Sequence, residues 1–309
     1  MRSLICAAIV FTGALFVRPV LNAAAPEGQG YLTPRAAARA LVAAAKSDDI
    51  ERLTKVLGPS AKDILVTNDT VADTQTRRKF VALAETRMSI ASDPKNPNMK
   101  ILEVGKDAWP LPIPLVRQQG RWHFDLERGK REILARRIGA NELVAIDVCR
   151  GYVEAQNDYA EVDRTGSGAK HYAQKIISSQ GKRDGLYWPS VHESDESPIG
   201  DAVTHAFAEG YTKKNEPYHG YYFKILTAQG SHATGGQMSY LQRGLMTKGF
   251  ALIAWPSSYG STGTMTFIVD KSGIVYQKNL GSKTDEIAGA YRAYDPDETW
   301  SPVGTSARK

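Results

Sequence analysis

Apolar and polar residues follow one another along the first half of the chain in a pattern that predicts helices and then strands. Thr33 and Pro34 begin the first helix, because a threonine hydroxyl can cap a first turn and proline fits the first helical position. Apolar residues three or four positions apart mark this helix and two more. The later helices are expected at about 49–57 and 73–90, and strands at 100–104, 115–118 and 121–125.

The second half is predicted to hold a long helix and a sheet. The helical pattern resumes at Gly129, and the residues from Gly139 to Asn141 are expected to interrupt it. Asn141 would then cap a new helix that reaches about Tyr159. Strands are expected at 218–227, 249–255, 264–270 and 274–278, with a hairpin loop at 271–273 and a terminal helix at 285–291.

Together these elements predict an α+β protein with two domains. Residues 26–138 would form helices and a curved sheet, and residues 139–309 a roll in which the long helix packs on an antiparallel sheet. The first domain loosely resembles the cone-shaped nuclear-transport-factor-two-like fold. At roughly 100–200 residues per domain, a chain of 309 residues is long enough for two such cores.

The first 25 residues are expected to be a secretory signal peptide and not part of the fold. Arg2 supplies a positive start, residues 4–17 are mostly apolar, and small residues follow at 23–25. The apolar run is too short for a comfortable membrane span of about 20 residues. An uncleaved anchor flanked by Arg18 is the alternative. Cleavage would yield an exported protein, periplasmic or secreted, without a transmembrane span.

The distribution of charge along the chain indicates which kinds of partner the protein could bind. Residues 26–140 carry 20 basic and 14 acidic side chains, whereas residues 141–309 carry 17 and 19. For an exported protein the available polyanions are envelope polymers and lipid headgroups, and not nucleic acid.

Cys149 is the only cysteine after residue 25, so no intramolecular disulfide can form. Its place on an apolar helical face predicts a buried core residue.

Several long motifs resemble those of one bacterial family. They are Trp-Pro-Leu-Pro-Ile-Pro-Leu-Val at 109–116, the turn-rich segment 181–189, Pro-Tyr-His-Gly-Tyr-Tyr-Phe at 217–223 and Met-Thr-Phe-Ile-Val at 265–269. On these motifs the chain resembles the exported family catalogued as domain of unknown function 2950, over about residues 30 to 300. The resemblance implies an exported protein of uncharacterised activity, and it identifies no catalytic residues.

The C-terminal half is also similar to the soluble heads of type IV pilin-like proteins. The similarity lies in the long helix around 154–160, the aromatic segment 220–223 and the stretch 260–275. It implies a head in which one helix packs against an antiparallel meander. The hydrophobic N-terminal helix and the processing site of those proteins are absent from the start of this segment, so the similarity concerns the head fold and not filament assembly.

Motifs for catalysis and metal binding are incomplete. Ser179 and Lys182 have the S-x-x-K spacing of penicillin-binding enzymes, as do Ser167 and Lys170, but the companion motifs are missing. Oxygen-bearing side chains alternate from Asp163 as in a calcium loop, without the glutamate at the twelfth position. The six histidines show no ligand spacing with one another. The sequence therefore predicts no cofactor and no metal.

His219 is the residue that most suggests a pocket. It stands beside a glycine and among aromatic residues, and a second segment upstream offers a carboxylate and more aromatic rings. The pocket candidates are His219, Asp184, Tyr187, Trp188 and Tyr221. The alternative is that these aromatic residues belong to the sheet and the core. The sequence alone does not show whether the two segments lie close together in the fold.

These observations favour a non-enzymatic envelope protein that binds another envelope protein, a polymer or a small ligand. The alternative is a periplasmic hydrolase with a site around His219 and Asp184. An enzyme should place His219 within hydrogen-bond reach of a carboxylate in a concave site. A binding module should instead expose an aromatic or basic patch, without such a pair.

Overall fold

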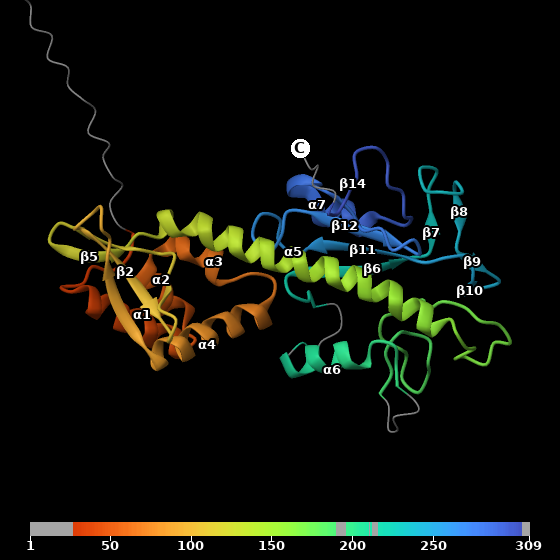
Figure 1. Cartoon of the computed structure of the whole chain (residues 1–309), viewed down its shortest axis with the longest axis horizontal. Coiled ribbons are helices and arrows are strands. Elements are labelled where there is room, and N and C mark those ends of the chain that lie inside the picture. The colour runs from red at the N-terminus through yellow and green to blue at the C-terminus, as the bar shows by residue number, and fades with distance from the viewer. Residues whose placement is uncertain (1–26, 190–195, 210, 212–215, 305–309) are drawn as a thin grey trace, which may run out of the picture.

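The computed structural model describes residues 27–189, 196–209, 211 and 216–304, so the predicted signal peptide lies outside the described residues. Residues 27–125, here termed the N-terminal lobe, fold as helices packed on one sheet (Figure 1). The helices are α1 (Pro34–Lys46), α2 (Ile50–Leu57), η1 (Pro59–Ala61), α3 (Lys62–Leu65) and α4 (Thr70–Thr86).

Side-chain caps set the beginnings of three of these helices. Thr33 caps α1, Asp49 caps α2 and Asp69 caps α4, each by accepting a hydrogen bond from a backbone N–H three residues further on. The predicted helix at 73–90 is wrong at its end. Its last residues belong to the strand β1 (Met88–Ser92), because they pair with the strand that follows.

The sheet of the N-terminal lobe is antiparallel, in the order β1-β2-β4-β5, with β3 paired to β2. Its other strands are β2 (Met99–Val104), β3 (Trp109–Pro110), β4 (Leu115–Gln118) and β5 (Arg121–Phe124). Leu102, Leu115 and Phe124 are buried against the helices, where they meet Leu41 and Leu53. The sheet and the helices therefore share one apolar core.

A single helix, α5 (Leu126–Tyr159), runs through both halves of the molecule (Figure 1). The predicted interruption at 139–141 is wrong. Glycine inside a helix costs only about 0.5–1 kcal/mol relative to alanine, so Gly139 is tolerated. Asn141 does not cap a new helix, because it lies within the continuous helix; its amide donates to the Thr262 carbonyl at 2.9 Å. The expected boundary between residues 138 and 139 falls inside this helix, which both lobes share.

Residues 160–304, the C-terminal lobe, contain a five-stranded antiparallel sheet in the order β14-β13-β12-β11-β6. The elements are α6 (Gly200–Glu209), β6 (Tyr221–Leu226), β7 (Ala228–Gln229), β8 (Met238–Ser239), β9 (Leu241–Gln242), β10 (Leu245–Met246), β11 (Ala251–Pro256), β12 (Thr266–Asp270), β13 (Tyr276–Lys278), η3 (Gly281–Lys283), α7 (Thr284–Ala290) and β14 (Ser301–Pro302). The four predicted strands correspond to β6, β11, β12 and β13. Helix α6 was not predicted.

The two faces of this second sheet are covered by different helices. Helix α5 packs on β11 and β12, and α7 contacts β11. Tyr221 on β6 lies near Cys149 of α5, whereas Lys224 bonds the end of α7, as expected for strand residues of opposite parity. The predicted α+β class, with a long helix on an antiparallel sheet, is confirmed.

Cys149 lies in the core of the C-terminal lobe and is fully buried. Burial raises the pKa of its thiol to about 12. A thiol that stays protonated and has no access to solvent is not a nucleophile, so the prediction of a core cysteine is confirmed. No helix in the described part of the chain is both long and apolar enough to cross a membrane.

Candidate functional site

The structure places the predicted pocket residues at two separate points along α5. The turn that carries His219 lies beside Asn141, since a Cβ on Gly220 would stand 2.6 Å from the Asn141 amide nitrogen. The segment with the predicted aspartate lies at the far end of α5, where the Tyr159 hydroxyl donates to the Arg183 carbonyl at 2.6 Å. At 1.5 Å per residue, these two points on the helix are about 27 Å apart. The predicted histidine and aspartate therefore do not share a pocket.

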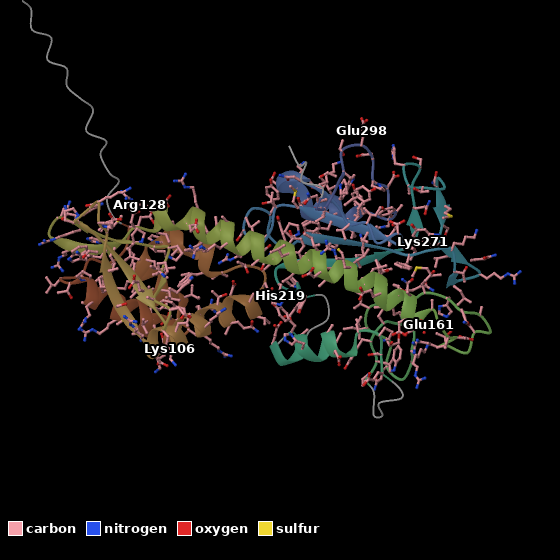
Figure 2. The ribbon with its side chains drawn as sticks, in the orientation of Figure 1. Lys106, Arg128, Glu161, His219, Lys271 and Glu298 are labelled. Carbon is pink, nitrogen blue, oxygen red and sulfur yellow. The ribbon has the colours of Figure 1, made fainter. Side chains whose placement is uncertain are left out.

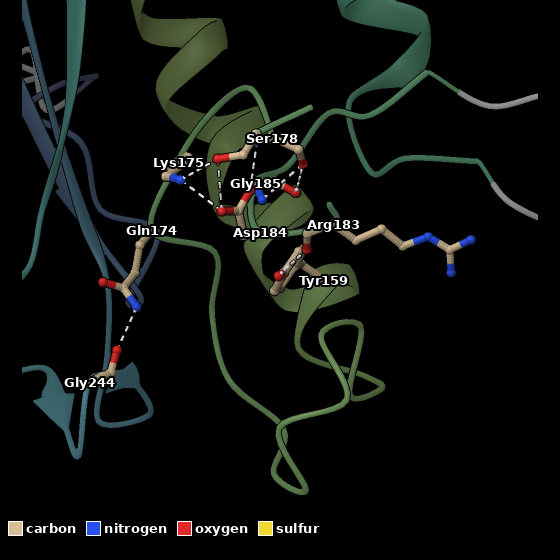
Figure 3. Close-up of polar contacts among 9 residues, drawn as sticks. Tyr159, Gln174, Lys175, Ser178, Arg183, Asp184, Gly185 and Gly244 are labelled. Carbon is tan, nitrogen blue, oxygen red and sulfur yellow. Dashed lines mark hydrogen bonds and ion pairs between the residues drawn. The ribbon is translucent and has the colours of Figure 1, made fainter. Parts of the chain in front are cut away.

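Asp184 closes a loop in the C-terminal lobe (Figure 3). One carboxylate oxygen accepts the Lys175 ammonium at 2.7 Å, and the other accepts the Ser179 N–H at 2.7 Å. Partial burial raises the pKa of this carboxyl, but the hydrogen bonds from Lys175 and Ser179 together outweigh it and lower the pKa to about 2. The Ser179 hydroxyl also accepts from Lys175 at 2.7 Å, which explains this serine as part of a loop closure.

Tyr187 and Trp188 also have structural roles in this loop. The Trp188 ring is buried, with the guanidinium of Arg164 at 5.4 Å and that of Arg183 at 5.8 Å from its centroid. The backbone of Tyr187 pairs with the segment 176–178 through hydrogen bonds of 2.8 and 2.9 Å. These contacts agree with the alternative interpretation, in which the aromatic residues stabilise the fold.

His219 and Gly220 form the two-residue loop of a tight turn before β6. Both have positive φ, 45° for His219 and 75° for Gly220, which is the geometry of a type I′ turn. Tyr218 and Tyr221 close the turn by exchanging two backbone hydrogen bonds of 2.8 and 3.1 Å. Tyr221 itself is fully buried and donates its hydroxyl to the Met265 carbonyl, so it is a core residue and not a pocket wall.

The imidazole of His219 meets a carboxylate that the sequence did not point to. Its Nε2 lies 3.0 Å from Glu209 of α6, and the side chains are 25% and 24% exposed. His205 contacts the other carboxylate oxygen of Glu209 at 3.4 Å. Figure 2 shows His219 at the middle of the molecule, where the two lobes approach each other. A carboxylate that orients an imidazole is one half of a general acid–base site.

Asp69 lies directly behind this turn and is only 2% exposed. Its Oδ2 accepts the Gly220 N–H at 2.7 Å and the Tyr211 hydroxyl at 3.0 Å, and that hydroxyl in turn accepts the His219 N–H at 3.2 Å. Burial, with the charge of Asp69 beside it, raises the pKa of Tyr211. Its hydroxyl therefore stays protonated and acts as a fixed donor. A pattern for a helix cap could have identified Asp69, but no sequence pattern indicates its contact with Gly220.

A second candidate site lies on the N-terminal lobe. The Trp-Pro-Leu-Pro-Ile-Pro motif forms an open hollow of about 300 Å³ together with β2 and the first turns of α5. Its lining residues are Met99, Ile101, Pro110, Leu111, Pro112, Pro114, Arg128 and Arg136. Trp109 stands beside it, 41% exposed, with the Arg136 guanidinium 5.6 Å from its ring centroid. Two cations thus flank an apolar floor.

The arginines of the hollow are held by exposed ion pairs. Arg128 contacts Asp125 at 2.8 Å, and Arg136 contacts Glu132 at 2.6 Å. A second hollow of about 580 Å³ continues around α5. It is lined by Glu127, Arg128, Lys130, Arg131 and Leu134. Exposed pairs contribute about 0–1 kcal/mol, so an incoming anion can replace the carboxylates at little cost.

The predicted calcium-like loop is organised by one side chain. The carboxylate of Asp163 accepts the backbone N–H groups of Thr165, Ser167 and Gly168 at 2.7–3.1 Å. These contacts account for the turn without an ion. Within the described ranges, no group of three or more histidine, cysteine, aspartate or glutamate side chains is placed to hold a metal.

Comparison with known proteins gives one match. A sequence model of the family described as protein of unknown function (DUF2950) matches residues 28–303, nearly the whole chain. No curated protein matches, and no solved structure matches. The similarities to type IV pilin-like heads and to the nuclear-transport-factor-two-like fold therefore remain predictions.

Proposed function

The chain belongs to the DUF2950 family of proteins of unknown function, as its motifs predicted, and we propose that it is an exported, non-enzymatic binding module. Its ligand would be an anion with an apolar part, held in the hollow beside Arg128 and Arg136. The observation that carries the proposal is the pairing of these two guanidiniums with a floor of proline, leucine, isoleucine and methionine.

The hollow offers binding groups for both the anionic part and the apolar part of such a ligand. Arg128 and Arg136 are eight residues apart on α5, about 12 Å along the helix, so both ends of the hollow offer a bidentate donor for carboxylate or phosphate. The floor between them offers only apolar contact. A purely apolar molecule would leave the guanidiniums unused, and a small inorganic anion would leave the floor in water.

The proposed location rests on the predicted signal peptide, and it limits the choice of ligand. In the cell envelope, anions with apolar parts are carried by lipids, by acidic polymers and by the acidic segments of other proteins. The excess of basic residues in 26–140 would attract any of these over long range at low ionic strength.

Three probes test the proposal directly: octyl phosphate, octyl glucoside and inorganic phosphate. We expect octyl phosphate to bind at least tenfold more tightly than either of the others, measured by calorimetry and by the shift in thermal unfolding. The double variant Arg128→Gln, Arg136→Gln should lose this preference. Arg150→Gln is the matched control, because Arg150 is also an exposed, ion-paired arginine of α5. Equal affinity for octyl phosphate and octyl glucoside would contradict the proposal.

Hydrolysis is the second candidate function, and the 3.0 Å contact between His219 and Glu209 favours it. The hydrolytic site would then contain Glu209 in place of Asp184. The test is turnover of p-nitrophenyl acetate and bis-p-nitrophenyl phosphate by the wild type and by His219→Gln. A general base contributes about 10²–10⁴-fold, so the variant should lose nearly all turnover. His232→Gln is the control, because His232 also pairs with a carboxylate, that of Asp295, at 3.1 Å.

A further inference from the structure

One short stretch of α5 lies between the attachments of the two lobes. The last attachment to the N-terminal lobe is Arg137, which donates to the Ile64 carbonyl of α3. The first attachment to the C-terminal lobe is Asn141, which donates to the Thr262 carbonyl. Gly139 lies between them, exposed, and a Cβ there would meet nothing within 4 Å. Of the three glycines in α5, Gly139 is the one that lies between these two attachments, and glycine is among the weakest helix formers.

In the described part of the chain, the hydrogen bonds between the lobes outside α5 come from Asn68, Asp69 and Gln75. Asn68 donates to the Ser257 carbonyl at 2.6 Å, Asp69 accepts the Gly220 N–H, and Gln75 donates to a carbonyl at the end of α6. The two apolar cores are separate clusters, each within its own lobe. Hydrogen bonds of this kind can be replaced by hydrogen bonds to water at a small net cost in free energy, whereas separating a shared apolar core would cost more.

Asn68 and Asp69 occupy the end of the β6–β11 ladder. Tyr221 pairs with Pro256, so the same register makes Gly220 the partner of Ser257, and the Ser257 N–H does donate to the Gly220 carbonyl at 2.9 Å. The second bond of such a pair would run from the Gly220 N–H to the Ser257 carbonyl. Instead, the Gly220 N–H donates to the Asp69 carboxylate, and the Ser257 carbonyl accepts from the Asn68 amide. The two side chains thus replace one of the two hydrogen bonds of this residue pair.

We propose that the two lobes hinge at Gly139 and that Asn68 and Asp69 are the latch that holds them closed. When the latch withdraws, the Gly220 N–H and the Ser257 carbonyl can bond each other, so neither backbone group is left without a partner. Opening and closing then exchange one set of hydrogen bonds for another, which keeps the two states close in free energy.

Spin labels on the two lobes test the hinge. Lys106→Cys and Lys271→Cys place labels on opposite lobes (Figure 2), and the buried Cys149 will not react. Distances are then measured by pulsed electron resonance. The added changes Asn68→Ala and Asp69→Ala should produce a second distance population. Gly139→Ala, which stiffens the helix, should reduce that population by roughly two- to fivefold.

Asp49→Ala is the control, because it removes the cap of α2 inside one lobe and should leave the distances unchanged. If the double latch variant does not fold, Asn68→Ala alone is used, since it removes a single bond. A single distance, the same in the latch variants as in the wild type, would overturn the hinge. Amide hydrogen exchange tests the replacement hydrogen bond. In the double latch variant the Gly220 amide should stay as protected as in the wild type. Hydrogen exchange of this amide more than tenfold faster than in the wild type would overturn the proposal that it bonds the Ser257 carbonyl instead.

Discussion

The carboxylate of Asp69 accepts the backbone N–H of Gly220 at 2.7 Å, although the two residues are 151 positions apart in the chain. Its other oxygen accepts the Ala72 N–H at 2.9 Å and so caps α4. One buried side chain therefore begins a helix in the N-terminal lobe and fixes the turn of His219 in the C-terminal lobe. The same turn places the imidazole of His219 3.0 Å from Glu209.

Replacement of Asp69 should cost much more than replacement of an ordinary helix cap. Asp69→Ala removes a cap, worth about 1 kcal/mol, and leaves the buried Tyr211 hydroxyl without its acceptor, worth about 1–3 kcal/mol more. We expect a loss of roughly 2–4 kcal/mol in the free energy of unfolding, measured with urea. Asp49→Ala removes a cap and an exposed ion pair with Arg52, which contributes little, and should cost about 1 kcal/mol. Equal losses in the two variants would show that the contact between the lobes adds no stability.

Two glycines with nearly the same φ should respond differently to alanine. Gly220 has φ 75° and Gly273 has φ 76°, so each alanine variant carries the left-handed penalty of about 1–2 kcal/mol. At Gly220 the new Cβ would also stand 2.6 Å from Asn141 and 2.8 Å from Thr262, whereas at Gly273 it meets nothing within 4 Å. Gly220→Ala should therefore cost about 1–3 kcal/mol more than Gly273→Ala in thermal or urea unfolding. A smaller loss at Gly220 would contradict the close packing of the turn.

Lys224 should stabilise the end of α7. Its ammonium donates to the carbonyls of Gly289 and Tyr291 at 2.7 and 2.8 Å, and these groups have no partner within the helix. The Arg292 guanidinium also donates to both carbonyls, at 3.0 and 3.1 Å, so neither loses its last partner when Lys224 is replaced. Lys224→Met keeps the length of the side chain and removes one of the two donors, so we expect a loss of about 0.5–1.5 kcal/mol. Lys271→Met, at an exposed lysine, should change stability by less than about 0.5 kcal/mol. Amide exchange in α7 should accelerate in the first variant only.

Asp184 should make the loop that it closes sensitive to acid. Its carboxyl has a pKa of about 2 in the folded protein, below its ordinary value of 3.8. Because the folded pKa is the lower one, the ionised group stabilises the fold above pH 3.8, and this stability is lost as the pH falls towards 2. Asp184→Asn should reduce the dependence of stability on pH in that window. Asp147→Asn, at an exposed ion pair on α5, is the control for the loss of one surface carboxylate.

The elements of the fold were largely predictable because their signals are local. Thr33-Pro34 begins α1, and the apolar strands β11 and β12 lie where the pattern placed them. The errors came from glycine and asparagine at 139–141, whose local preference for a break was overridden by the packing of α5 along both lobes. Helix α6 was missed, and with it Glu209, the partner of His219.

The amino-acid sequence by itself determined the α+β class, the part of the long helix from Asn141 to Tyr159, the buried Cys149 and the family, because capping, periodicity and long motifs are properties of neighbouring residues. It also singled out His219. Only the tertiary structure decided which carboxylate meets that histidine: Glu209 reaches it, and Asp184 is held at the far end of α5 by Lys175 and Ser179. Contacts between distant segments depend on how the lobes pack, and no local pattern of residues records that packing.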